Sequence, residues 1–411
     1  MKRYSWAFAG LLAFVAASSR GRADAVVLSG LDVLGAKKYS LLKGKTVGVI
    51  TNQTGRDRDG VSMVELLGKA PGVTLSAIFS PEHGFTGSIE AGDAAASSVY
   101  KLGDGRSVPI YSLYKGGLAG MRPKEEELKG LDALVFDIQD AGARFYTYPA
   151  TMAMAMEEAQ KHKLEFFVLD RPNPVNGVTI EGPVAEDMLR GVTSVTYFKE
   201  PVRHGLTVGE IATMYAKEIG YAKLTVVKMR GWRREMWYDQ TGLPWIAPSP
   251  NLPDLDSAAL YPGVAVFEAS NLSVGRGTPS PFRWVGAPWL DAAAVVEELK
   301  RAGLEGVDFS VADYTPTKDP FTGTPCRGVL VRVADRERAR PLAVFAKLYR
   351  AVRRANPGEV KWDATALQRM IGTSKFQPLA DADDSSAEAI QGLLDQGPKD
   401  FAAARKPCLL Y

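Results

Sequence analysis

TLSAIFSPEHGF, residues 74–85, sets the pattern from which the rest of the fold can be worked out. Its first six residues form an apolar run with the length of one buried strand, and Pro81 and Gly84 mark a turn directly after that run. Glu82 and His83 lie inside the turn. In an open α/β sheet, ligands bind in the crevice outside the carboxyl ends of the strands. A carboxylate and an imidazole at such a place indicate chemistry more than packing.

Apolar runs of similar length recur along the first part of the chain. They cover residues 47–50, 134–138, 166–169 and 224–227. Amphipathic stretches that are typical of helices separate them, at residues 61–69, 148–161 and 207–219. The last stretch begins with Thr207 and Glu210, which have the spacing of a capping box. Strands that are apolar on both faces and alternate with helices indicate a parallel sheet covered on both sides, so we predict an α/β fold.

The later part of the chain predicts a second, smaller unit. Residues 231–288 are rich in Trp, Pro, Gly and Asn and have little helical period, which indicates long loops around one strand at residues 263–267. Beyond them, a helix at residues 292–302, a strand at 328–333 and a helix at 341–353 indicate another α/β region. A chain of 411 residues is long enough for two domains.

Residues 1–25 have the pattern of a signal peptide. Lys2 and Arg3 precede an apolar stretch at residues 6–17, and Ala23 and Ala25 form a small-x-small cleavage signature. The apolar stretch is too short to span a bilayer, and a short membrane anchor is the alternative. No second run of about 20 apolar residues follows. We therefore expect an exported protein, periplasmic or secreted, without stable membrane insertion after signal cleavage.

Charge and composition argue against several classes of partner and cofactor. The formal net charge of +3, without a basic stripe interleaved with aromatic residues, argues against nucleic acid. Cys326 and Cys408 occur in no C-x-x-C arrangement, which excludes a zinc site built on cysteines, while a disulfide and two independent thiols both stay open. The chain has three His and no H-E-x-x-H motif. We expect no cofactor and no metal, although an Asp-rich magnesium or calcium site stays open.

Three carboxylates are candidates for catalysis. Glycoside hydrolysis uses a pair of carboxyl groups, one of which protonates the leaving oxygen. Glu82 is the expected general acid, and Glu268 or Asp140, each expected just after a strand, is the second carboxylate. His83 is expected to orient the ligand. The competing interpretation is that Glu82 only caps the next helix beside a structural His, and a retaining or an inverting course stays open.

Seven further residues are candidates for substrate binding: Asn52, Arg144, Tyr146, Asn173, His204, Asn271 and Arg276. They lie in predicted loops, where binding residues are common. Arg144 can form a fork with a carboxylate of the ligand or of a neighbouring Asp. Tyr146 either stacks on a sugar or covers the sheet edge, and Asn173 either binds ligand or fixes its loop. Arg276 either binds an anionic ligand or braces its loop through Glu268.

Many segments, in order along the chain, resemble one bacterial family. They cover residues 48–55, 80–84, 136–148, 169–174, 203–207, 242–245, 249–253, 261–263, 275–278 and 286–289. This family includes the exo-β-N-acetylmuramidase NamZ, and its members are also called YbbC-like proteins. It was formerly described as a domain of unknown function. Where that family often reads E-G-T-N-L-S-E-G-R-G-T, this chain departs at Ala269, Ser270 and Val274.

The resemblance implies a fold, an activity and a catalytic residue. The implied fold is a Rossmann-like parallel-sheet domain over residues 26–288 and a smaller C-terminal α/β domain over residues 289–411, with the active site in the cleft between them. The implied activity releases N-acetylmuramic acid from the non-reducing end of peptidoglycan fragments, with catalysis centred on Glu82. The lactyl carboxylate of that sugar makes Arg144 and Arg276 candidate partners. A periplasmic muropeptide- or sugar-binding protein without catalysis is the alternative.

Overall fold

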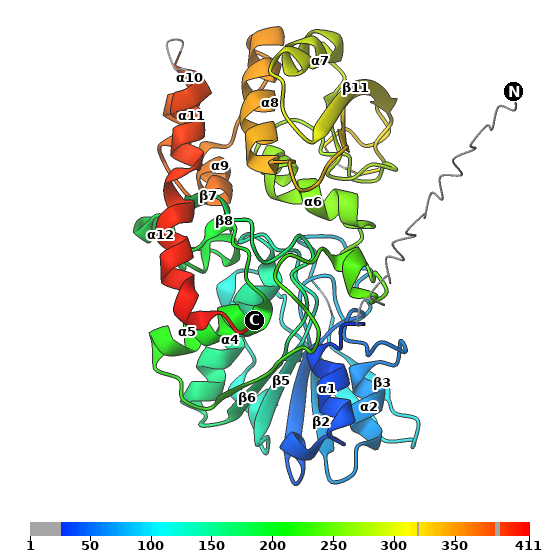
Figure 1. The fold of residues 1–411 in the computed structure, drawn as a ribbon. Coiled ribbons are helices and arrows are strands. Elements are labelled where there is room, and N and C mark those ends of the chain that lie inside the picture. Colours follow the sequence, from blue (N-terminus) through cyan, green and yellow to red (C-terminus); the bar gives the residue numbers. More distant parts are fainter. Residues whose placement is uncertain (1–25, 95, 319, 383–386) are drawn as a thin grey trace, which may run out of the picture.

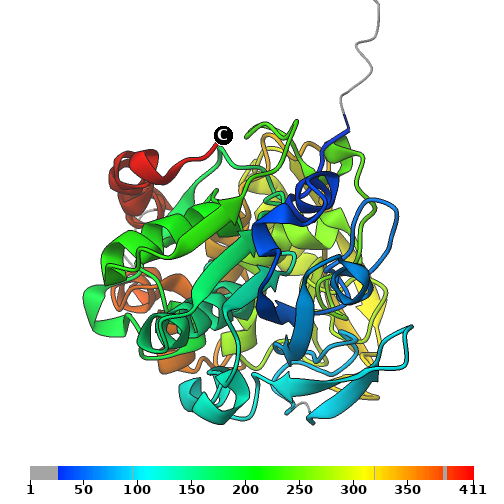
Figure 2. The ribbon, with the colours of Figure 1, turned by 90° about the horizontal axis from the view of Figure 1, so that it is seen from below.

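A seven-stranded sheet forms the centre of the larger domain in a computed structural model, which describes residues 26–94, 96–318, 320–382 and 387–411 (Figures 1 and 2). The strand order is β3-β4-β2-β1-β5-β6-β9, and every neighbouring pair is parallel except β3 with β4. The strands are β1 (Thr46–Thr51), β2 (Thr74–Ser80), β3 (Ser98–Lys101), β4 (Ser107–Ser112), β5 (Ala133–Asp137), β6 (Glu165–Leu169) and β9 (Leu224–Val227). The predicted parallel sheet is confirmed, and β3 and β4 extend it at one edge. The predicted signal peptide lies outside the described residues.

Helices cover both faces of this sheet, because its central strands are apolar on both sides. In β5, Val135 points to one face and packs with α1 (Gly30–Ala36) and α2 (Met63–Lys69). Its neighbour Phe136 points to the other face, which α4 (Thr147–Lys161) and α5 (Val208–Ile219) cover. The short helix α3 (Glu125–Leu128) precedes β5. The predicted capping box is present at the start of α5.

Residues 263–267 are helical, so the prediction of a strand there is wrong. They form the end of α6 (Leu255–Val264) and the start of the 3₁₀ helix η6 (Ala265–Ala269). Asp254 caps α6 by accepting a hydrogen bond from the amide of Ser257. Every residue of α6 from Ser257 onward is buried, and a helix buried on all sides shows the same continuous apolar run as a buried strand. Glu268 therefore lies within a 3₁₀ helix instead of following a strand.

The smaller domain is built on an antiparallel sheet in the order β10-β12-β11. Its strands are β10 (Trp284–Ala287), β11 (Val307–Tyr314) and β12 (Cys326–Val333). The predicted helices are present as α7 (Ala292–Arg301) and α8 (Pro341–Ala355), and they pack against each other. Phe267 of η6 contacts Phe345 of α8, with ring centroids 5.2 Å apart. These rings belong to a core that continues to Phe136 of the large sheet. One apolar core therefore joins the two domains.

After α8 the chain returns to the larger domain. Helices α9 (Ala364–Ile371), α10 (Phe376–Asp381) and α11 (Ala387–Leu394) lead to α12 (Gln396–Arg405), which packs on the two-stranded sheet of β7 (Glu181–Val184) and β8 (Pro201–Arg203). In Figure 1, α11 and α12 form the red column along one side of the molecule. The domain boundary after residue 288 stays a prediction.

Two further expectations concern single segments of the chain. Cys326 and Cys408 are both buried and free, which corresponds to the alternative of two independent thiols. None of the helices in the described ranges is long and apolar enough to cross a membrane.

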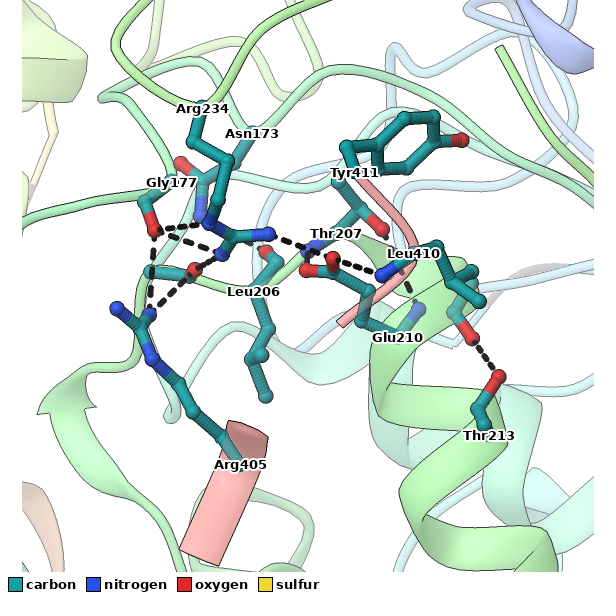
Figure 3. Close-up of polar contacts among 12 residues, drawn as sticks. Asn173, Gly177, Leu206, Thr207, Glu210, Thr213, Arg234, Arg405, Leu410 and Tyr411 are labelled. Carbon is teal, nitrogen blue, oxygen red and sulfur yellow. Dashed lines mark hydrogen bonds and ion pairs between the residues drawn. The ribbon is translucent and has the colours of Figure 1, made fainter. Parts of the chain in front are cut away.

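Residues 405–411, which we call the 405–411 strap, tie the end of α12 to loops of the larger domain (Figure 3). The Nη atoms of Arg405 donate to backbone carbonyls of two loops, those of Gly177, Val178, His204 and Gly205. The hydroxyl of Tyr411 donates to Oδ2 of Asp170 at 2.8 Å and accepts a hydrogen bond from the amide of Met229 at 2.7 Å. The strap therefore supplies hydrogen-bond partners to polar groups that the larger domain would otherwise bury without them.

Removal of the Tyr411 hydroxyl should measurably destabilise the protein. In a Tyr411→Phe variant, Asp170 loses one donor and the Met229 amide loses its acceptor. A buried polar group left without a partner costs about 1–3 kcal/mol, so urea unfolding should show a loss of that size. Tyr111→Phe, at a partly buried tyrosine of β4, serves as the matched control. Equal stability of the Tyr411→Phe variant and the wild type would show that the strap contributes nothing through this hydroxyl.

Candidate active site

The loops that follow the parallel strands meet along one edge of the large sheet, as predicted. Asn52 follows β1, Glu82 follows β2, Asp140 follows β5 and Asn173 follows β6. The strands β2 and β5 lie on opposite sides of β1, so the order in which strands are added reverses there. Ligands bind at such a switch point in open α/β sheets. The topology therefore places these residues where a ligand site is expected.

Glu82 is buried and held by two hydrogen-bond donors, one from its own loop and one from the start of α4. The amide of Gly84 donates to the carbonyl of Pro81 at 3.0 Å and closes the turn that carries Glu82. Oε1 of Glu82 accepts a hydrogen bond from the amide of Gly92 at 3.0 Å, and Oε2 accepts one from the hydroxyl of Thr147 at 2.5 Å. The side chain is fixed in position, as a general acid needs to be. The residue is 8% exposed, which leaves an edge of it accessible.

His83 adopts a backbone conformation that few residues other than glycine adopt. Its φ is +67°, in the left-handed region, which is uncommon and costly for a residue with a Cβ. Its Nδ1 lies 2.6 Å from the carbonyl oxygen of Ile89. Because a carbonyl oxygen only accepts, Nδ1 carries the proton, and Nε2 has the lone pair in the neutral ring. Such backbone strain is typical of functional turns.

Three buried tyrosines connect the predicted carboxylates. Tyr146 contacts Tyr148 and Tyr261 edge to face, with ring centroids 4.7 and 5.9 Å apart. Burial raises the pKa of the Tyr261 hydroxyl well above its usual value, and the negative charges of Glu268, Glu82 and Asp140 raise it further, while Arg276 lowers it. The charges of all three carboxylates therefore act on the hydroxyl of Tyr261. The sequence predicted each carboxylate separately, and that they act together in one site stays a prediction.

Glu268 and Arg276 form the ion pair that the sequence left as one of two alternatives. The Nε of Arg276 lies 2.6 Å from Oε1 of Glu268, and its guanidinium lies over the ring of Phe282 at 5.1 Å. Both side chains stay partly exposed, at 18% for Arg276 and 31% for Glu268. The pair braces its loop and still presents both charges at the surface of the site.

Asp140 and His204 lie side by side together with Glu200, which the sequence did not reveal. Oδ2 of Asp140 accepts a hydrogen bond from the amide of Gly142 at 2.8 Å and lies 3.5 Å from Nε2 of His204. Burial raises the pKa of Glu200 to about 7, and the negative charge of Asp140 contributes to this rise, while the positive charge of Arg144 opposes it. In the sequence, Glu200 follows a lysine and resembles one half of a solvated charge pair. Its position four residues before His204 is the only signal that could have pointed to it.

Arg144 forms no fork with a neighbouring Asp among the described residues, and a contact with a carboxylate of the ligand stays a prediction. Its Nη atoms donate to the backbone carbonyls of Val195, Arg369 and Met370. The side chain is 2% exposed, and it connects the end of α9 to the large domain. A guanidinium is well suited to this, since its planar fork binds several carbonyls at once.

Asn173 and Asn271 also use their side chains to hold backbone. Asn173 donates to the carbonyl of Leu206 and accepts from the amide of Val175. Asn271 donates to the carbonyl of Glu359 and accepts from the amide of Lys361. These contacts correspond to the alternative in which such residues fix loops. Substrate contacts of Asn173 and Asn271 stay predictions.

Several buried polar atoms near the predicted carboxylates hydrogen-bond to no other atom of the described residues. They are Nδ2 of Asn52, Oδ1 of Asp140, the hydroxyl of Tyr146, Oε1 of Glu200, Nε2 of His204 and Nδ2 of Asn251. Buried polar groups nearly always have partners, so these atoms are open to hydrogen bonds with a polar ligand or with water. Across the described ranges, no three His, Cys, Asp or Glu side chains are grouped as a metal would require.

The fold and the site together are those of an α/β protein with a carboxylate-rich edge, the kind of site that glycoside hydrolases use. The chain belongs to the exo-β-N-acetylmuramidase NamZ family, with residues 47–256 matching its N-terminal domain and residues 259–411 its C-terminal domain. The predicted family membership is thereby confirmed.

Similar proteins support this assignment along nearly the whole chain. The peptidoglycan β-N-acetylmuramidase NamZ of Bacillus subtilis (strain 168) is 38% identical over 387 residues, which are 94% of this chain and 91% of that protein. Crystal structures of two DUF1343 family proteins from Bacteroides fragilis NCTC 9343 have TM-scores of 0.83 and 0.74, at 35% and 28% identity. Each comparison covers 94% of this chain and 99% of the other.

Proposed function

We propose that this protein is an exo-acting glycoside hydrolase that releases N-acetylmuramic acid from the non-reducing end of peptidoglycan fragments. The observation that carries the proposal is the placement of Glu82, which follows β2 at the switch point of the sheet, is buried, and is fixed by Gly92 and Thr147. The 38% identity to a peptidoglycan β-N-acetylmuramidase supports the same activity. Family membership supplies the reaction class, and the site supplies the groups that perform it.

In this proposal Glu82 protonates the leaving oxygen. It is the carboxyl closest in character to a general acid, because it is buried and held from two sides. Glu268 or Asp140 acts as the second carboxylate. His83 orients the ligand through Nε2, since Nδ1 is bound to the carbonyl of Ile89.

The activity is tested by incubating the protein with a MurNAc-GlcNAc disaccharide and with a chromogenic N-acetylmuramide. Free N-acetylmuramic acid should appear from both. Binding of the disaccharide in a calorimeter without any product would contradict the proposal and favour the sugar-binding alternative.

Arg276 is the proposed partner of the lactyl carboxylate. Its side chain is 18% exposed, whereas the Arg144 guanidinium is bound to carbonyls. In an Arg276→Met variant, the KM for the N-acetylmuramide should rise by about 10- to 100-fold, which corresponds to the loss of a charge-assisted hydrogen bond of about 1.5–3 kcal/mol. The KM for the same substrate with its lactyl group amidated should change little.

Arg327→Met is a suitable control for this prediction, because that side chain is 57% exposed on the smaller domain's sheet. If the Arg276→Met variant raises the KM equally for both substrates, Arg276 only braces its loop through Glu268.

Export is a further part of the proposal. It rests on the charged and apolar pattern of residues 1–25. N-terminal sequencing of the protein recovered from outside the cytoplasm should begin near residue 26. Recovery of an uncleaved chain from the membrane fraction would favour the short-anchor alternative.

A further inference from the structure

A buried cluster of four ionisable side chains lies next to the proposed catalytic carboxylates. Glu200 precedes β8, His204 follows it, and Asp140 and Arg144 come from the loop after β5. Their exposed fractions are 1%, 0%, 3% and 2%. Oε1 of Glu200 and Oδ1 of Asp140 hydrogen-bond to no atom of the described residues. In the proposed reaction Asp140 is a candidate for the second carboxylate, and Glu200 has no role.

The ring of His204 is neutral in this arrangement. The backbone amide of Leu206 donates to Nδ1 of His204 at 3.0 Å, so Nδ1 carries a lone pair. The ring proton is therefore on Nε2, which faces Oδ2 of Asp140 at 3.5 Å. A second proton on Nδ1 would break the hydrogen bond to Leu206 and place a charge in a fully buried position. His204 thus adds a donor and no charge to the cluster.

Charge balance then requires one proton on the two carboxyl groups. Arg144 is the one cation of these four side chains, and its Nη atoms bind only backbone carbonyls, which do not neutralise it. One ionised carboxylate balances it, whereas a second would be an uncompensated buried charge. Oδ2 of Asp140 accepts the amide hydrogen of Gly142. Oε1 of Glu200 has no such donor among the described residues.

We propose that Glu200 is a positioning residue that holds a proton in the active enzyme and thereby keeps Asp140 as the single ionised carboxylate of the cluster. This rests on the proposed function, because Asp140 is one of the carboxylates assigned to the reaction. Loss of the proton from Glu200 to solvent would place a second negative charge beside Asp140. The groups that face Glu200 are Asp140, His204 and Arg144.

A Glu200→Gln variant tests this proposal, because glutamine mimics the protonated carboxyl at every pH. In the wild type, kcat/KM on the chromogenic N-acetylmuramide should fall by about tenfold per pH unit above about pH 7, as one ionisation removes the competent form. In the variant, this alkaline limb should move upward by about one pH unit or more, with activity at low pH retained. Glu297→Gln, at an exposed position of α7, should keep the wild-type profile. An unchanged limb, or a uniform loss at all pH values, would overturn the proposal.

Thermal unfolding gives a second readout that needs no substrate. The pKa of Glu200 is raised in the folded protein from 4.5 to about 7, so its stabilising contribution is complete below pH 4.5 and is lost as the pH rises through about 7. The Tm of the wild type relative to Glu200→Gln should therefore fall between about pH 4.5 and 7 and stay level above that. A constant difference would overturn the proposal even in an active enzyme.

These readouts separate the two proposals. If neither protein releases N-acetylmuramic acid but the Tm difference changes with pH, the proposed function fails and the proton on Glu200 stands. If the Glu200→Gln variant does not fold, infrared spectra of the wild type labelled with 13C-glutamate replace it, because burial raises the pKa of Asp170 to about 7 as well and the label separates the two carboxyl groups. A band of a protonated carboxylic acid that disappears as the pH rises through about 7 supports the proposal, and its absence at low pH contradicts it.

Discussion

Replacement of Glu82 by Gln is expected to lower kcat on the MurNAc-GlcNAc disaccharide by about 10²- to 10⁴-fold, the usual contribution of one general acid. Glutamine can still accept the Gly92 amide hydrogen and can donate to the Thr147 hydroxyl, so the turn should keep its structure. Stability in urea and binding of the disaccharide should therefore change little. The measurement is the steady-state rate of N-acetylmuramic acid release beside the unfolding curve of the same preparation.

Substrates with different leaving groups distinguish a general-acid role of Glu82 from other roles. A nitrophenyl group needs little protonation to depart, so the loss caused by Glu82→Gln should be much smaller on a nitrophenyl N-acetylmuramide than on the disaccharide. Glu90→Gln is the matched control, since Glu90 lies in the same loop and pairs with Lys318 at 3.3 Å. Equal losses on both substrates would mean that Glu82 is not the general acid, and an active variant would remove it from the mechanism.

Replacement of Arg144 by Met should destabilise the protein strongly, by about 3–5 kcal/mol, as expected when one partner of a buried charged cluster is removed. The carbonyls of Val195, Arg369 and Met370 lose their donor, and the buried carboxyl groups Glu200 and Asp140 lose the cation that balances them. Arg144→Lys should recover only part of this stability, because an ammonium lacks the planar fork. Urea unfolding of the two variants measures both effects.

Kinetics of the folded Arg144→Lys variant separate this structural role from substrate binding. A structural role predicts lower stability with a KM close to that of the wild type. Normal stability with a strongly raised KM would restore Arg144 as a substrate ligand. Arg332→Met serves as the control, since that side chain is 70% exposed and its surface ion pair should contribute less than about 1 kcal/mol.

The large sheet could be predicted because each of its main strands is a continuous apolar run in the sequence. The runs that became β1, β2, β5, β6 and β9 are apolar on both faces, as strands of a covered parallel sheet are. The same signal misled at residues 263–267, since a helix buried on all sides is equally continuous. The short edge strand β3 is largely exposed and has no apolar run to mark it.

The candidate site was predictable only in part. Glu82, Asp140 and Asn52 follow strands, so their meeting at one edge follows from parallel topology. The burial of Glu200 beside His204 depends on how β8 packs, which no local pattern encodes. The contacts of Arg144 could not be predicted for a related reason: its acceptors are backbone carbonyls of segments as distant as residue 370, and every residue has such a carbonyl.

The 405–411 strap has a consequence for the order in which this protein can be made. Its partners Glu210 and Asp170 precede Leu410 and Tyr411 by 200 and 241 positions. All strands of the parallel sheet are therefore synthesised long before the residues that complete the hydrogen bonds of this domain. Contacts of such high sequence separation form late and slow folding. Until then, the nascent α/β domain lacks the hydrogen-bond partners that the strap provides. A chain that terminates shortly before the strap should therefore be recognised by chaperones and proteases.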